Sequence, residues 1–258
     1  MTLKDSSGNT TTNLVGVIAE IGNHHLGSVE VAKSMILAAK RAGADFVKMQ
    51  AIDPQVVYKT GSMPYEFYKE CELTTDEYIS CIQYGKTIGV TVFFSVFGEK
   101  HAIVSKIFRN SLYKISGGQF KAASPQKLFN NNHHRTIVSI PDEAEISKDK
   151  AAAIWAMQKM YVTPYLPEKV NWSYLEKLKK KFGRVGYSDH TPGVDNCKIA
   201  INRYGCTLLE KHFHLGTDIV YQGKRYRDCL HAATPDEFKN LTDYFKERLD
   251  AMPNLSRP

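Results

Sequence analysis

The feature that most constrains the fold is a regular alternation of short β-rich runs with amphipathic helical segments. Strands that alternate with helices form parallel βαβ units, and eight such units that close on themselves form a barrel. The sequence therefore predicts an α/β protein with a single-domain (β/α)8 TIM barrel. The predicted strands are Val15–Ile21, Asp45–Gln50, Thr91–Phe97, Leu112–Ser116, Thr136–Ile140, Met160–Thr163, Arg184–Ser188 and Thr207–His212.

Helix signals between the strands support this alternation. Val29–Arg41 has apolar residues at helical spacing and is followed by a glycine that ends the helix. Thr75–Ile88 begins at a threonine pair suited to the N-cap, and Pro235–Leu249 has proline in its first turn. An open doubly wound sheet is the weaker alternative, because no Gly-x-Gly-x-x-Gly follows a predicted strand. Lys121–Arg135, short and polar, is the least regular stretch, and Asn130–His134 within it is expected to be a loop.

Length and composition limit the classes that remain. The 258 residues match the roughly 250 of a typical barrel, with a polar tail over residues 1–13 and the barrel over 14–258. There is neither an apolar signal core nor a run of about 18–20 apolar residues, so a cytoplasmic protein without a membrane segment is expected. Five cysteines without a Cys-x-x-Cys indicate reduced thiols. The net charge of +7, without an aromatic-interleaved basic stripe, favours a small anionic substrate over nucleic acid.

Two lysines stand out among the polar residues at the predicted strand ends, where parallel barrels place their active sites. Lys48 and Lys114 lie in otherwise apolar strands, and lysine is rarely buried unless it is paired. Two lysines in one barrel mouth repel each other unless an anion lies between them. With nearby serine hydroxyls they would bind a phosphate or carboxylate. The alternative is that each lysine pairs with a carboxylate such as Glu20 or Glu210.

Two histidines follow neighbouring predicted strands. His190 lies near the end of Val185–Thr191, and His212 lies near the end of Leu208–Phe213. Neutral imidazoles in pairs commonly begin a divalent-metal site, although each histidine would also suit a simple hydrogen bond at a strand end. Two ligands do not retain a metal, so water and substrate would complete its shell. The chemistry expected is an anionic substrate that meets a carbonyl polarised by a metal.

These residues, in this order, resemble those of the sialic acid synthase family, barrel enzymes that condense phosphoenolpyruvate with an N-acyl sugar. The resemblance covers about residues 14 to 250, and its motifs are specific in combination rather than singly. Beside Tyr65–Leu73 and Asp228, the matching segments are Ile18–Gly22 with His25 and Gly27, Ala42–Gln50, Tyr113–Ile115, Gly186–Thr191 and Glu210–Phe213.

The resemblance implies a role for each strand-end residue. It implies that phosphoenolpyruvate is bound by Lys48, Lys114, Ser139 and Ser188. A divalent ion, expected to be Mn²⁺ with Mg²⁺ or Co²⁺ as alternatives, would be held by His190 and His212. The sugar would face Glu20, Gln50 and Asp228, with Ser95 in place of a sugar-contacting threonine. Glu20 would manage protons or hold the metal-bound water, so the expected catalytic residues are Glu20, Lys48, Lys114 and His212.

The sequence also departs from the family pattern. The usual Lys-Ile-x-Ser-x-Glu continues here as Ser116-Gly117-Gly118-Gln119, so Ser116 would replace a serine and the amide of Gln119 a carboxylate. Family members usually continue into an antifreeze-like domain whose arginine reaches the partner's sugar site, whereas this chain stops at Pro258. Either a partner subunit would supply that lid, or the sugar would lack the group that the lid recognises, and the basic loop Lys224–Arg227 could substitute for the arginine. A homodimer is the alternative to a partner subunit as the assembly.

Three functional classes remain open. The leading one is a metal-dependent synthase that makes a 3-deoxy-ulosonic acid and phosphate from phosphoenolpyruvate and an aldose. The loss of the carboxylate at Gln119 favours a catalytically silent barrel that binds a ligand or a partner synthase. Retention of two lysines and two histidines opposes it, because a structural barrel has little use for buried charge at four strand ends. A metal-dependent aldolase or isomerase is the third class and would release no phosphate.

Overall fold

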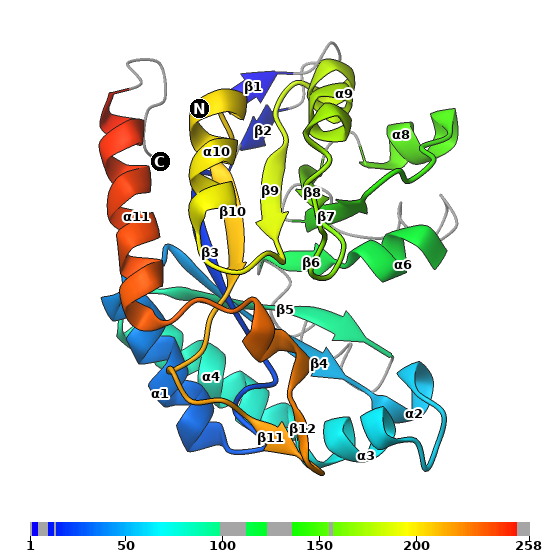
Figure 1. The fold of residues 1–258 in the computed structure, drawn as a ribbon, viewed down its shortest axis with the longest axis vertical. Helices are drawn as coiled ribbons and strands as arrows, with labels where there is room; N and C mark the ends of the chain where they lie inside the picture. Colours follow the sequence, from blue (N-terminus) through cyan, green and yellow to red (C-terminus); the bar gives the residue numbers. More distant parts are fainter. Residues whose placement is uncertain are drawn as a thin grey trace.

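The computed structural model describes residues 2–4, 10–12, 14–98, 112–122, 136–154 and 157–251. Its centre is a closed barrel of parallel strands in the order β10-β3-β4-β5-β6-β7-β8-β9, closed where β10 pairs with both β3 and β9. The (β/α)8 TIM barrel is therefore confirmed (Figure 1). The strands are β3 (Gly16–Gly22), β4 (Phe46–Ile52), β5 (Thr91–Phe97), β6 (Tyr113–Ile115), β7 (Thr136–Pro141), β8 (Gln158–Val162), β9 (Gly186–Asp189) and β10 (Leu208–His212).

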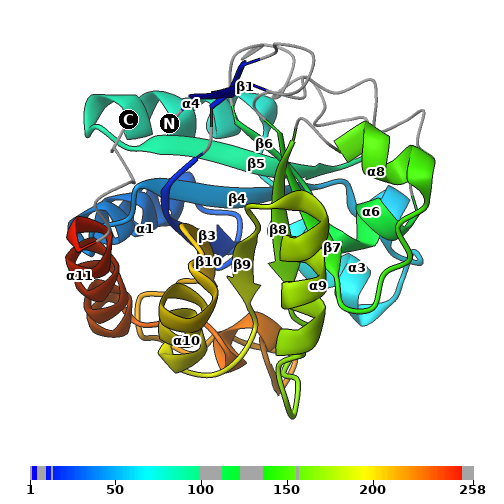
Figure 2. The same cartoon turned by 90° about the horizontal axis from the view of Figure 1, so that it is seen from above.

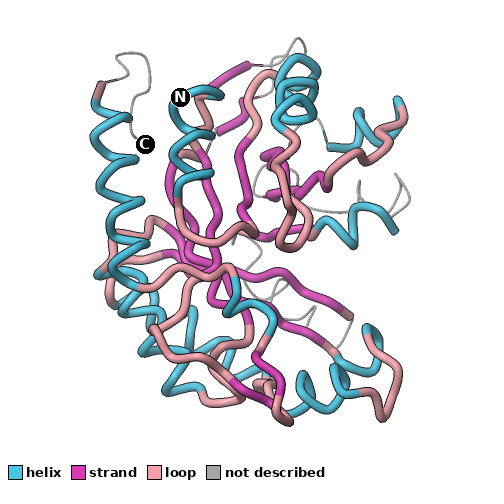
Figure 3. Tube along the Cα trace, in the orientation of Figure 1, coloured by secondary structure: helices cyan, strands magenta, loops and turns pink. Residues whose placement is uncertain are grey.

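Helices surround the barrel, as the view from above shows (Figure 2). Their alternation with the strands along the chain is clear where the trace is coloured by secondary structure (Figure 3). The helices are α1 (Val29–Arg41), α2 (Pro54–Val57), α3 (Met63–Glu70), α4 (Thr75–Thr87), α6 (Gly117–Ala122), α8 (Lys148–Ile154), α9 (Trp172–Phe182), α10 (Asp195–Tyr204) and α11 (Pro235–Asp250).

The predicted helix signals act as expected at the observed boundaries. Helices α4 and α11 each begin with a capping box, in which the threonine before the helix and a glutamate three residues later exchange hydrogen bonds. Ser28 caps α1, whose buried face consists of Ala32, Met35, Ile36 and Ala39. The main apolar core lies between this ring of helices and the barrel.

The barrel interior is layered because side chains alternate between the two faces of a strand. The layer nearer the amino ends of the strands is apolar and consists of Ile18, Phe93, Ile137, Met160 and Leu208. Two residues further along the same or neighbouring strands, toward their carboxyl ends, the interior positions become polar: Glu20, Lys48, Ser95, Lys114, Ser139, Ser188 and Glu210. The pleat of the strands thus carries all of these side chains to one end of the barrel.

Small elements flank the two ends of the barrel. Strands β1 (Thr2–Lys4) and β2 (Thr10–Thr12) pair antiparallel within the segment expected to be a polar tail. At the opposite end, the β11 (Val220–Tyr221) and β12 (Lys224–Arg225) hairpin precedes the 3-10 helix η2 (Arg227–Leu230) (Figure 1). The loop expected at Asn130–His134 lies outside the described residues. All five cysteines are buried and free, and no described helix is long and apolar enough to cross a membrane.

Candidate active site

A group of buried charged side chains with one serine, here called the lysine cluster, lies in the barrel mouth. It consists of Glu20, Lys48, Lys114, Ser188 and Glu210. Lys114 Nζ lies 2.5 Å from Glu210 Oε1, Lys48 Nζ lies 3.7 Å from the same oxygen, and Lys48 also contacts Glu20. Ser188 Oγ donates to Glu210 Oε1 at 3.0 Å. Each lysine is therefore paired with a carboxylate, as the second interpretation of the sequence expected.

Burial and mutual attraction set the protonation of this cluster. Burial opposes ionisation of Glu210, but Lys114 and then Lys48 outweigh it and bring the pKa of that carboxyl down to about 2. Burial lowers the pKa of Lys48 to about 7, and it also lowers the pKa of Lys114. A lysine this close to its neutral form depends on a neighbouring anion to stay charged. The cluster therefore favours anionic oxygens around both lysines.

Two further serines lie beside the lysine cluster. Ser95 Oγ accepts a hydrogen bond from Lys48 Nζ at 3.5 Å, on the strand next to it. Ser139 is 1% exposed, yet its hydroxyl has no hydrogen-bond partner. A buried hydroxyl without a partner is costly, so Ser139 is available to donate to a bound oxygen.

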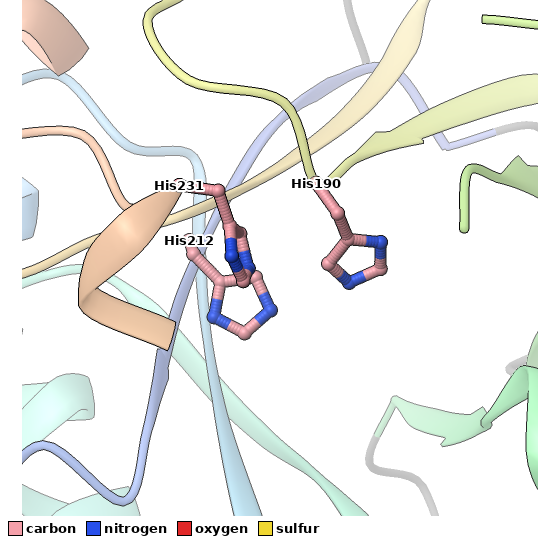
Figure 4. Close-up of side chains that lie close together, drawn as sticks. All are labelled: His190, His212 and His231. Carbon is pink, nitrogen blue, oxygen red and sulfur yellow. The ribbon is translucent and has the colours of Figure 1, made fainter. Parts of the chain in front are cut away.

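Three histidines, the histidine cluster, lie in the same mouth, two of them one interior step beyond Ser188 and Glu210 toward the carboxyl ends of β9 and β10. His190 follows β9, His212 ends β10, and His231 follows η2 (Figure 4). The pairwise distances between their ring centroids are 5.2 Å for His190 and His212, 5.0 Å for His190 and His231, and 4.5 Å for His212 and His231. One ring nitrogen from each lies within 4.8 Å of the others.

Burial keeps this cluster neutral. Desolvation lowers the pKa of His231 to about 2, with further lowering from His190. Desolvation also takes the pKa of His212 well below its ordinary value and lowers that of His190. His190 Nδ1 lies 2.9 Å from the carbonyl oxygen of Thr163, and because a carbonyl only accepts, Nδ1 carries the proton. The Nε2 lone pair of His190 is then free for a ligand.

Asp228 lies between His212 of the histidine cluster and the hydroxyl of Tyr226. Its Oδ2 accepts a hydrogen bond from the Tyr226 hydroxyl at 3.0 Å and lies 3.8 Å from His212 Nδ1. Burial raises the pKa of Asp228. Gln50, another residue predicted to face the sugar, lies within β4, and its side-chain oxygen accepts a hydrogen bond from Asn23 Nδ2 at 3.4 Å.

Ser116 and Gln119 have local partners. Gln119 N donates to Ser116 Oγ at 3.2 Å, and Ser116 N donates to Gln119 Oε1 at 3.0 Å, which is the reciprocal pattern of a capping box at the start of α6. Gln119 Nε2 also donates to the carbonyl of Val96 at 2.7 Å. This amide thus ties the end of β5 to α6, a role that a carboxylate would not perform.

The basic loop Lys224–Arg227 has partners of its own as well. Arg225 pairs with Asp218 at 2.6 Å, and the Arg227 guanidinium lies 3.6 Å from the centre of the Tyr165 ring. Tyr165 in turn donates its hydroxyl proton to the Arg227 carbonyl at 2.7 Å. These contacts fasten η2 to the loop after β8.

His231 is the residue of this site that sequence reasoning missed. It lies in a loop three residues after Asp228 rather than at the end of a predicted strand. The only local signal is the spacing Asp228-Cys-Leu-His231, which has no periodicity to connect it with His190 or His212.

Comparison with known proteins identifies the family. The model of the NeuB family matches residues 35–255. The chain is 27% identical to the pseudaminic acid synthase of Campylobacter jejuni over 94% of its own length and 76% of that protein. It is 26% identical to the N-acetylneuraminate-9-phosphate synthase of Drosophila melanogaster, over 94% and 70%.

A solved structure shows the same fold. The N-acetylneuraminic acid synthetase of Leptospira borgpetersenii superposes with a TM-score of 0.79 at 20% identity, covering all of this chain and 92% of that one. The resemblance to the sialic acid synthase family is thereby confirmed. The chain belongs to the NeuB family, and it is a transferase of the sialic acid synthase type.

Proposed function

We propose that this protein condenses phosphoenolpyruvate with an aldose to give a 3-deoxy-ulosonic acid and inorganic phosphate. In this reaction C3 of phosphoenolpyruvate attacks the sugar aldehyde, water adds at C2, and phosphate leaves with cleavage of its C–O bond. The observation that carries the proposal is the juxtaposition, in one barrel mouth, of two buried lysines with a cluster of neutral histidines.

The lysine cluster is proposed to bind the anionic substrate. The carboxylate of Glu210 contacts both Lys48 and Lys114. Phosphate or carboxylate oxygens would share these two cations, and charge-assisted hydrogen bonds of this kind are the strong ones. The unpartnered hydroxyl of Ser139 supplies a further donor. Ser188, already oriented by Glu210, lies at the same edge.

The histidine cluster fits a divalent ion. His212 Nδ1 and both ring nitrogens of His231 are buried without hydrogen-bond partners, and neutral imidazole is the protonation state that binds metals. When bound, the ion would polarise the sugar aldehyde as a Lewis acid. His190 and His212 would hold it, and Asp228 would orient His212 as an outer carboxylate.

Glu20 is proposed to handle protons beside the reacting carbons. Its Oε1 accepts a hydrogen bond from Gly22 N at 2.7 Å, while its other oxygen contacts Lys48. These two contacts hold the carboxylate at the border of the lysine and histidine clusters. A proton that arises during water addition would have this group within reach.

The experiment that tests the function is phosphate release from phosphoenolpyruvate with Mn²⁺, against free, N-acylated and phosphorylated aldoses. Release that requires one sugar class and stops with EDTA is expected, and it would name the acceptor. A folded protein that releases no phosphate with any sugar would overturn the proposal. Consumption of a sugar without release of phosphate would indicate the aldolase or isomerase class instead.

A further inference from the structure

His231 is buried in a way that no contact within the described protein explains. It is 1% exposed, and neither Nδ1 nor Nε2 has a hydrogen-bond partner. An imidazole that loses water without gaining a partner destabilises the folded protein. Its aromatic neighbours, Tyr165 and the other two rings of the histidine cluster, supply packing but accept or donate no bond. A bound ion would explain the burial of this ring.

Backbone hydrogen bonds fix where His231 lies. Ala233 N donates to the carbonyl of His212 at 2.7 Å, and His214 N donates to the carbonyl of Ala233 at 3.1 Å. This short parallel bridge joins residues 213 and 233, so the chain after η2 runs alongside the end of β10. His231 is therefore held against His212 by main-chain contacts, although the two are far apart in sequence.

The geometry of the cluster suits a metal with three protein ligands. The three ligand nitrogens lie within 4.8 Å of one another, and among the described residues no other group of three or more such side chains converges in this way. A tetrahedral ion with metal–nitrogen bonds of about 2.1 Å would hold them about 3.4 Å apart. The neighbouring pair His24 and His214 has ring centroids 6.2 Å apart and lacks a third member.

We propose that His231 is a third protein ligand, so that the ion is held by His190, His212 and His231 together. This inference rests on the proposed function for what the ion does, but not for whether the ion binds. Three imidazole nitrogens favour Zn²⁺, Co²⁺ or Fe²⁺, whereas Mg²⁺ and Mn²⁺ prefer oxygen ligands. The protein would then retain its ion without substrate and would exclude Mg²⁺.

The test measures metal binding without turnover. Wild-type protein stripped with EDTA is titrated with Zn²⁺ by calorimetry and with Co²⁺ by its visible absorption, alongside His231→Ala and His231→Gln. His214→Ala is the matched control, because His214 is also buried with an unpartnered ring nitrogen. We expect one ion per chain, weakened at least about 100-fold by either change at His231, beyond the usual cost of losing an outer partner. The control should keep wild-type affinity.

Thermal unfolding separates a ligand from a structural histidine. Without metal, His231→Gln should melt no lower than wild type, because the imidazole has no partner to lose, and its metal-induced rise in Tm should disappear. Unchanged Zn²⁺ affinity in His231→Ala, or an equal loss in His214→Ala, would overturn the assignment. If the expected loss is seen but no sugar elicits phosphate release with Mn²⁺, Co²⁺ or Zn²⁺, the proposed synthase fails and the three-histidine site stands.

Discussion

The lysine cluster and the histidine cluster share one barrel mouth but meet burial in opposite ways. Lys48 and Lys114 are paired with the carboxylates of Glu20 and Glu210, so the charges compensate one another without a ligand. In the histidine cluster, His212 Nδ1 and both nitrogens of His231 lack partners. The charges of the lysine cluster are paired within the protein, whereas the histidine cluster has buried ring nitrogens for which the protein supplies no hydrogen-bond partner. Four predictions test this difference, from the largest expected effect to the smallest.

Replacing Lys114 by methionine should affect both turnover and stability. The change removes the 2.5 Å partner of Glu210 and leaves a buried carboxylate with only the more distant Lys48. Breaking a buried ion pair costs about 3–5 kcal/mol, so the free energy of unfolding should fall by this amount and phosphate release should be lost. Urea unfolding and the phosphate assay measure the two effects. Adding Glu210→Gln should restore stability but not turnover, and near-normal turnover in Lys114→Met would contradict the anion site.

The two clusters should respond to acid in different pH windows. The pKa of His231 is about 2 in the folded protein against 6.5 when unfolded, so the unfolded chain binds the extra proton. His231 therefore does not affect the pH dependence of stability above about pH 6.5, and it destabilises the folded protein progressively as pH falls toward 2, at up to about 1.4 kcal/mol per pH unit. Burial is the main cause that lowers the pKa values of His24 and His25 to about 4, so these two histidines also destabilise the folded protein as pH falls from 6.5 to about 4.

Glu210 responds only at lower pH. Its pKa of about 2 lies below the ordinary 4.5, so its contribution is complete above pH 4.5 and is lost between 4.5 and 2. Urea midpoints of the metal-free protein should therefore begin to fall just below pH 6.5. His231→Gln should make this fall less steep without abolishing it, because His24 and His25 still contribute, while Glu210→Gln should leave the slope between pH 6.5 and 5 unchanged. A flat profile down to pH 5 would show that the histidines are not buried neutral.

Metal should stabilise the protein only through the histidine cluster. At an ion concentration of 100 times Kd, binding should add about 2.7 kcal/mol to the free energy of unfolding. His212→Gln should abolish this gain and change the metal-free stability little, because His212 Nδ1 has no partner. Differential scanning calorimetry with and without Zn²⁺ measures both values. A gain that survives His212→Gln would place the ion elsewhere.

Gln119→Glu should have the smallest effect. The carboxylate cannot donate to the carbonyl of Val96, so the 2.7 Å bond is lost and the free energy of unfolding should fall by about 1–2 kcal/mol. We expect the KM for phosphoenolpyruvate to stay unchanged, because Lys48 and Lys114 keep their contacts. Steady-state kinetics on the variant checks this, and a large change in KM would show that the Gln119 side chain reaches the substrate.

The sequence was sufficient for the barrel because every level of it agrees. Strand runs, the threonine pair at the start of α4 and Pro235 in the first turn of α11 all indicate the same architecture. The partners of Lys48 and Lys114 stayed open, since a choice between a bound anion and Glu210 depends on distances across the barrel. His231 was out of reach because a turn and a main-chain bridge to β10 bring it to the site.

Ser116 and Gln119, which the sequence suggested for substrate binding, form local hydrogen bonds at the start of α6. Their spacing of three residues suits a capping box, and they form one. In the family motif the serine stands at position 117 and the carboxylate at position 119, so Ser116 is only a neighbour of the lost serine, and its separation from Gln119 is that of a capping box.

The bridge between residues 213 and 233 has a practical consequence for engineering. The chain leaves the barrel rim after His214 and returns to the same point before α11, so the excursion between them is closed at its base. At its far end, the β11–β12 turn contains Gly223, with φ of +74° and no heavy atom within 4 Å of a Cβ built there. Exposed turns of this kind tolerate inserted sequence. A fluorescent reporter or affinity tag placed at Gly223 would leave His231 anchored beside β10.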